Sequence, residues 1–89
     1  MTNEKISRHQ RAEAFRQQIA LPNQRKEAIR TLIAKKSYDE ADEQRIKILF
    51  NKVSLAEGCE KEYMALIEHL YRDERMQPLA REFYKRWHA

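Results

Sequence analysis

Glycine and proline are rare in this sequence of 89 residues, which contains one glycine and two prolines. Tight hairpins, phosphate-binding loops and nucleophile elbows need residues that tolerate a positive φ, and Gly58 is almost the only candidate. No stretch alternates apolar and polar residues as a half-buried strand does. We therefore expect an all-α fold, a small bundle of four to five short, mostly antiparallel helices.

Cysteine is equally scarce. Cys59 is the single cysteine, which excludes an internal disulfide and a cysteine-rich metal site, so we expect a reduced, partly buried thiol. His9, His69 and His88 lie far apart, and none has the spacing of metal ligands. We therefore expect neither a bound metal nor a cofactor.

Long apolar runs are also missing, since none approaches the ~18 residues that a membrane span needs. Residues 1–8 contain no apolar stretch of a secretory signal. These two features predict a cytoplasmic protein. The sequence holds no Walker loop, no dinucleotide fingerprint and no paired Cys/His or Asp/His arrangement, so we expect a protein that is not an enzyme.

Charge is abundant and unevenly spread. Charged residues make up 36% of the chain, apolar residues 42%, and the net charge is +4. Residues 1–37 hold nine Lys or Arg and three Glu, a net +6, while residues 38–89 hold nine Lys or Arg and eleven Asp or Glu, a net −2. This composition predicts one helical domain over 1–89 with a thin core, frayed over 1–10, which a homodimer could complete.

The first two helices are separated by Pro22, which disfavours a helical conformation at the preceding residue. The first helix is predicted to end near Ala20 with Asn3 as its N-cap, and the second to span 24–36 with Asn23 as its N-cap. Their apolar positions are Ala12, Phe15 and Ile19, and then Ala28, Ile29, Leu32 and Ile33.

A third helix is predicted to begin at Ser37, because Ser37 and Glu40 have the spacing of a capping box. Acidic residues crowd this start, where the helix dipole favours them. On this reading, Ser37→Ala costs about 1 kcal/mol of stability.

The sequence allows three interpretations of where the third helix ends. Its stripe consists of Ile46, Leu49, Phe50 and Val53. The helix could end before a left-handed Gly58, a new helix could begin at a second capping box from Ser54, or one helix could span 38–72. We favour a break near Gly58, because a glycine inside a helix costs about 1 kcal/mol relative to alanine.

Two more helices are predicted over 60–71 and 77–88, with Pro78 in the first turn of the second. The inward positions of the first are Tyr63, Met64, Ile67, Leu70 and Tyr71. The apolar face of the second consists of Leu79, Ala80, Phe83, Tyr84 and Trp87.

The last helix supports our first hypothesis for function, a small module that binds a protein partner as an adaptor, inhibitor or regulator. Aromatic side chains interleaved with cations are typical of protein hot spots. We expect Tyr84 and Trp87 to make the contacts, with Arg81 and Arg86 at the rim.

Two alternatives remain. One is a regulator that binds nucleic acid through a basic face on the first two helices, unless that face is only solvated or pairs with the acidic start of the third helix. Its residues would be Arg8, Arg11, Arg16, Arg25, Lys26 and Arg30. The other is a structural subunit that is stable as a homodimer.

Overall fold

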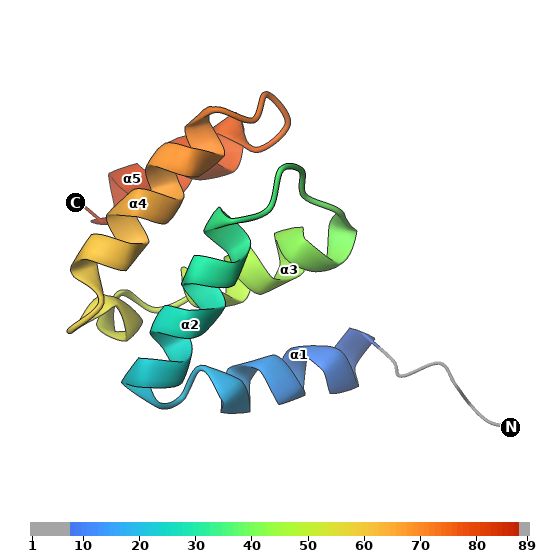
Figure 1. Ribbon diagram of the computed structural model, residues 1–89, viewed down its shortest axis with the longest axis vertical. Helices are drawn as coiled ribbons and strands as arrows, with labels where there is room; N and C mark the ends of the chain where they lie inside the picture. The colour runs from blue at the N-terminus through green and yellow to red at the C-terminus, as the bar shows by residue number, and fades with distance from the viewer. Residues whose placement is uncertain (1–7, 88–89) are drawn as a thin grey trace, which may run out of the picture.

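The computed structural model describes residues 8–87, with side chains for residues 9–86. This part of the chain is helical and contains no strand, so the predicted all-α fold is confirmed (Figure 1). The elements are α1 (Arg8–Gln18), α2 (Pro22–Ile33), α3 (Glu40–Leu49), the short 3₁₀ helix η1 (Val53–Ala56), α4 (Glu60–Tyr71) and α5 (Gln77–Trp87). Asn3, His88 and the side chains of Arg8 and Trp87 lie outside the described part.

The main helix contacts are α2 with α4, α4 with α5 and α1 with α3. Figure 1 shows α4 and α5 as an antiparallel hairpin at one end of the bundle, with α1 at the other end. One apolar core connects these layers. Its most deeply buried residues include Ile29, Ile46, Leu49, Leu66 and Leu70.

Several core residues differ from the predicted stripes. Leu66, Met76 and Tyr38 are buried although no stripe included them. Val53 was expected on the stripe of the third helix but is 55% exposed. The reason is that α3 ends at Leu49, and the following turn takes Val53 out of the helical register.

The start of α2 differs from the predicted cap at Asn23. Leu21 has φ −95° and ψ 136°, and Pro22 is the first helical residue. Proline is well suited to that position, because the first N–H groups of a helix have no partner within it. The helix ends at Ile33 rather than at residue 36.

The start of α3 also differs, because the capping box joins Asp39 and Asp42 rather than Ser37 and Glu40. The Asp42 backbone N–H donates to Asp39 Oδ1 at 2.8 Å, and the Asp39 N–H donates to Asp42 Oδ2 at 3.1 Å. Tyr38 explains the shift, because its buried hydroxyl donates to the Leu32 carbonyl at 2.9 Å and holds residue 38 in the connection. The bond from the Asp42 N–H keeps the pKa of the Asp39 carboxyl below its usual value.

The predicted break near Gly58 is confirmed. Gly58 has φ +79°, Cys59 is the N-cap of α4, and Glu60 begins the helix. A capping box at Ser54 does not form, since η1 has Lys52 as its N-cap and no side-chain cap. One continuous helix over 38–72 is therefore wrong as well.

Candidate partner-binding groove

The residues of the predicted basic face do not form one surface in the structure, and Arg25 is buried. This residue is 7% exposed. Its Nε donates to the Ile19 carbonyl at 2.8 Å, Nη2 to Ala20 at 3.0 Å and Nη1 to Leu55 at 2.8 Å. Arg25 thus ties the α1–α2 connection to η1, and its donors are committed to backbone rather than directed at phosphates.

The other α2 cations do not form a ridge with α1. Arg30 donates to Glu27 at 3.0 Å and lies 3.7 Å from a carboxylate oxygen of Glu62 on α4. Lys26 is half-buried. The two remaining described members of the set, Arg11 and Arg16, lie on α1 and face a different neighbour.

Two hollows, each of about 220 Å³, lie along the seam between α1 and α3, and we call them together the α1–α3 groove. The first is lined by Arg11, Ala12, Ala14, Phe15, Gln18, Ala41, Gln44, Arg45 and Ile48. The second is lined by Arg16, Ile19, Ala20, Ile48, Asn51, Lys52 and Leu55. Ile48 lines both hollows.

The floor of the groove is apolar and anchored in the core. Phe15 is 7% exposed and Ile19 is 2% exposed, and these two residues hold α1 on the bundle. Ile48 and Leu55 are half-buried and pack against the core from the other wall. The groove therefore offers apolar surface that a further side chain could cover.

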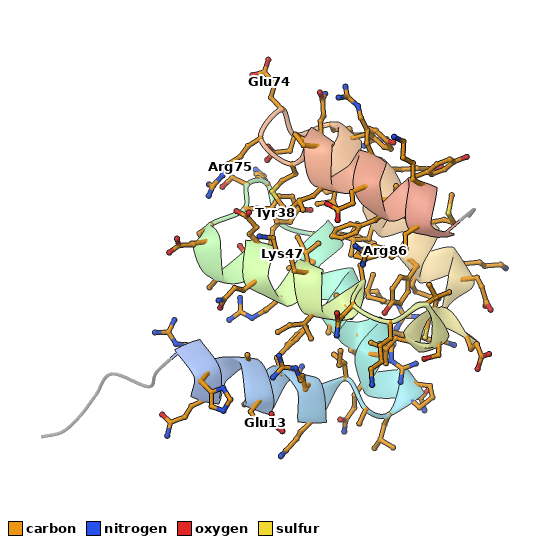
Figure 2. All side chains as sticks on the ribbon, turned by 180° about the vertical axis from the view of Figure 1, so that it is seen from behind. Glu13, Tyr38, Lys47, Glu74, Arg75 and Arg86 are labelled. Carbon is orange, nitrogen blue, oxygen red and sulfur yellow. The ribbon has the colours of Figure 1, made fainter. Side chains whose placement is uncertain are left out.

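Every charged side chain that lines the groove is a cation. Arg11 and Arg45 line the first hollow, and Arg16 and Lys52 line the second. Arg16 lies 3.5 Å from Glu13 in an exposed pair. Figure 2 shows Glu13 on the side of α1 that faces away from α3, so this carboxylate does not enter the groove.

The position of Arg45 is determined by Asp42, whose side chain is 1% exposed. Arg45 Nη1 lies 3.0 Å from Asp42 Oδ1, and Lys35 Nζ lies 3.0 Å from Asp42 Oδ2. A buried carboxylate needs such partners, because its removal from water is costly. The network that caps α3 thus also places a cation at the groove.

The described residues of the predicted α5 site, Arg81, Tyr84 and Arg86, are all exposed. Tyr84 is 42% exposed and Arg81 is exposed. Arg86 instead donates to the Phe50 carbonyl at the end of α3, at 3.0 Å, and pairs with Glu82 at 3.0 Å (Figure 2). Arg86 therefore joins α5 to α3, and the side chain of Trp87 lies outside the described part.

A larger hollow, of about 340 Å³, lies where α2 and α4 end. Polar groups that line this hollow are bonded to other parts of the fold. The Tyr38 hydroxyl is bonded to Leu32, and burial raises the pKa of Tyr38 to about 12. His69 Nε2 lies 3.3 Å from the Lys35 carbonyl oxygen, and its ring meets that of Tyr38 edge to face at 6.3 Å. These contacts hold the α2–α3 connection against α4.

Among residues 8–87, no three His, Cys, Asp or Glu side chains are grouped so that they could hold a metal ion. The described helices include none that is both long and apolar enough to cross a membrane. No protein-family model, curated protein or solved structure matches the chain.

Sequence reasoning missed the α3 side of the groove. No pattern in the sequence marks Arg45, Ile48 and Lys52 as site residues, because they lie far along the chain from Arg11 and Arg16. Only the contact between α1 and α3 brings them together. The basic stretch over 1–37 was the one available signal.

Proposed function

We propose that this protein is a non-catalytic binding module whose α1–α3 groove holds an acidic, apolar-bearing segment of a partner protein. One observation carries the proposal, an apolar floor between walls whose charged residues are all cations. Arg11 and Arg16, which the sequence suggested as nucleic-acid contacts, are assigned to this groove in the proposal. The proposal keeps the expectation of a cytoplasmic protein, in line with a sequence that has one cysteine and no disulfide framework.

The two components of the groove would play different roles. Full burial of one apolar side chain contributes about 1.5–3 kcal/mol. An exposed ion pair contributes only about 0.2–1 kcal/mol but excludes partners of the wrong charge and accelerates encounter. The floor would therefore supply most of the affinity, and the cations would select an acidic segment.

The apolar floor also favours a protein over a nucleic acid. Phosphate groups would satisfy the cations but leave Ile48 and Leu55 uncovered, whereas an apolar side chain between carboxylates covers both kinds of surface. The cations on α2 add little to a phosphate-binding face, since Arg25 is buried and Arg30 faces two carboxylates.

The test compares two charge reversals of equal size. Partners are captured from the cells that express the protein, purified, and titrated against the wild type. The groove variant is Arg16→Glu/Lys52→Glu. The matched variant is Arg81→Glu/Lys85→Glu, whose two cations are exposed on α5. We expect the groove variant to bind the purified partner at least about tenfold more weakly and the α5 variant to bind nearly as the wild type does.

Three results would overturn the proposal. One is equal affinity of the groove variant and the wild type. Another is loss of binding in the α5 variant alone, which would return the site to the last helix. The third is a purified partner that is DNA or RNA and whose affinity falls steeply with salt.

A further inference from the structure

Resting on the proposed function, we infer that the occupant of the α1–α3 groove is an acidic amphipathic α-helix that inserts one apolar side chain into each hollow. Four observations carry this inference: the direction of the groove, the spacing of its hollows, the distribution of its cations and the main-chain hydrogen bonding of the walls.

The groove follows two helices that lie side by side (Figure 1). The α1 residues of the first hollow centre near Ala14, and those of the second centre near Ile19. On the other wall the lining moves from Gln44 and Arg45 to Asn51 and Lys52. At 1.5 Å of rise per helical residue, the shift along α1 corresponds to about 7 Å. A similar distance separates side chains four positions apart on one face of a helix.

The cations flank each hollow from both sides. Arg11 of α1 faces the first hollow with Arg45 of α3, and Arg16 of α1 faces the second with Lys52. An amphipathic helix carries polar residues on both sides of its apolar stripe. Carboxylates beside the apolar stripe would meet Arg11 and Arg45 at the first hollow, and Arg16 and Lys52 at the second.

An extended segment fits the groove less well, although its alternate side chains have a similar spacing. A strand pressed onto an apolar floor needs main-chain partners for its N–H and C=O groups. Residues 8–87 contain no strand, and the walls of the first hollow are α1 and α3, two helices whose backbone bonds are internal. A helix satisfies its own backbone, so only its side chains need a match.

The probe is a blocked, fluorescein-labelled peptide of about 16 alanine and glutamate residues, with two central leucines four positions apart. Three matched peptides replace both leucines by serine, all glutamates by lysine, or one central alanine by proline. Anisotropy titrations with the full chain at about 50 mM salt are expected to show binding of the first peptide and about tenfold or greater weakening for each of the others.

Protein variants locate the binding. Arg16→Glu/Lys52→Glu is expected to weaken the leucine peptide at least about tenfold, and Arg81→Glu/Lys85→Glu to leave it unchanged. Ala12→Leu adds bulk to the first hollow and keeps a good helix former, so it should weaken binding without loss of helix. Circular dichroism of each variant shows whether the fold is retained.

The outcomes separate this inference from the proposed function. If a natural partner needs Arg16 and Lys52 but the leucine peptide does not bind, or the proline peptide binds equally well, the helical occupant is wrong and the groove function stands. If the partner binds the groove variant as tightly as the wild type, both the proposed function and this inference are wrong. Binding of a single-stranded or duplex oligonucleotide in place of the peptides overturns the inference, as does a homodimer in sedimentation that Ala12→Leu dissociates.

Discussion

At the scale of single residues, Asp42 links the start of a helix to the candidate site. One of its oxygens accepts the Asp39 N–H and lies 3.0 Å from Lys35 Nζ, while the other lies 3.0 Å from Arg45. The side chain is buried, and its charge is balanced by two cations that are themselves partly exposed. The same carboxylate therefore caps α3 and positions a cation at the α1–α3 groove.

The first prediction concerns the cap of α3. Asp39→Ala removes the acceptor of the Asp42 N–H and should lower the midpoint of thermal unfolding by about 4–8 °C. Ser37→Ala should leave the midpoint unchanged, because Ser37 is exposed and precedes the capping box. Calorimetry or a circular dichroism melt of the two variants measures both effects. A larger loss for Ser37→Ala than for Asp39→Ala would return the helix start to residue 37.

The lowered pKa of Asp39 gives this cap a pH dependence. Because the folded state favours the ionised carboxylate, the contribution is complete above the unfolded pKa of about 3.9 and is lost as the pH falls through the lower folded pKa. The difference between wild type and Asp39→Ala should therefore shrink in acid.

At the scale of elements, α1 packs mainly on α3, and Arg25 closes its connection to α2. The three carbonyls that Arg25 binds come from the α1–α2 connection and from η1. A planar guanidinium can reach all three at once, which a lysine ammonium on its flexible stem cannot do with the same geometry. One side chain of α2 therefore contributes to the seating of α1, together with the buried Phe15 and Ile19.

Arg25→Lys is thus expected to lower the free energy of unfolding by about 2 kcal/mol, because at least one carbonyl loses a charge-assisted bond. The control is Arg81→Lys on the exposed face of α5, which should change stability by less than about 0.5 kcal/mol. Urea denaturation followed by circular dichroism compares them. Equal stability of the two variants would show that the Arg25 bonds are not important for the fold.

At the scale of the whole molecule, the basic and acidic parts of the chain are joined by ion pairs between elements. Lys35 pairs with Asp42 at 3.0 Å, and Arg30 lies 3.7 Å from Glu62. Arg75, before α5, lies 3.4 Å from Glu43 of α3 (Figure 2). These pairs place acidic residues around α2, α3 and α4, whereas the charged residues that line the hollows of the α1–α3 groove are cations.

Alkaline pH tests the packing of the whole core through two tyrosines. Burial raises the pKa of Tyr38 from 10.0 to about 12 and raises that of Tyr63 as well. Since the folded state favours the neutral phenol, this stability is fully present below pH 10.0 and is lost as the pH rises through about 12. We expect part of the phenolate absorbance at 295 nm to appear together with the loss of helical ellipticity. Complete phenolate formation while the helices persist would contradict the burial of both rings.

The helices were largely predictable because their signals are local. Gly58 has no Cβ and adopts φ +79°, and the apolar period of 3.6 residues placed α4 and α5 within about a residue of their ends. The start of α3 was not predictable, since the capping-box rule selects Ser37 with Glu40, whereas Tyr38 is buried and the box forms between Asp39 and Asp42.

The candidate site depends on distances that no local pattern encodes. Arg25 has the same side chain as Arg16, yet one is buried against three carbonyls and the other stands at the groove. Composition and periodicity were sufficient for helices and their apolar faces, because each helix forms from neighbours in sequence. Packing between distant segments decides which helices meet, which cations bond within the fold and which remain at a surface. That packing alone brings α1 and α3 together around an apolar floor.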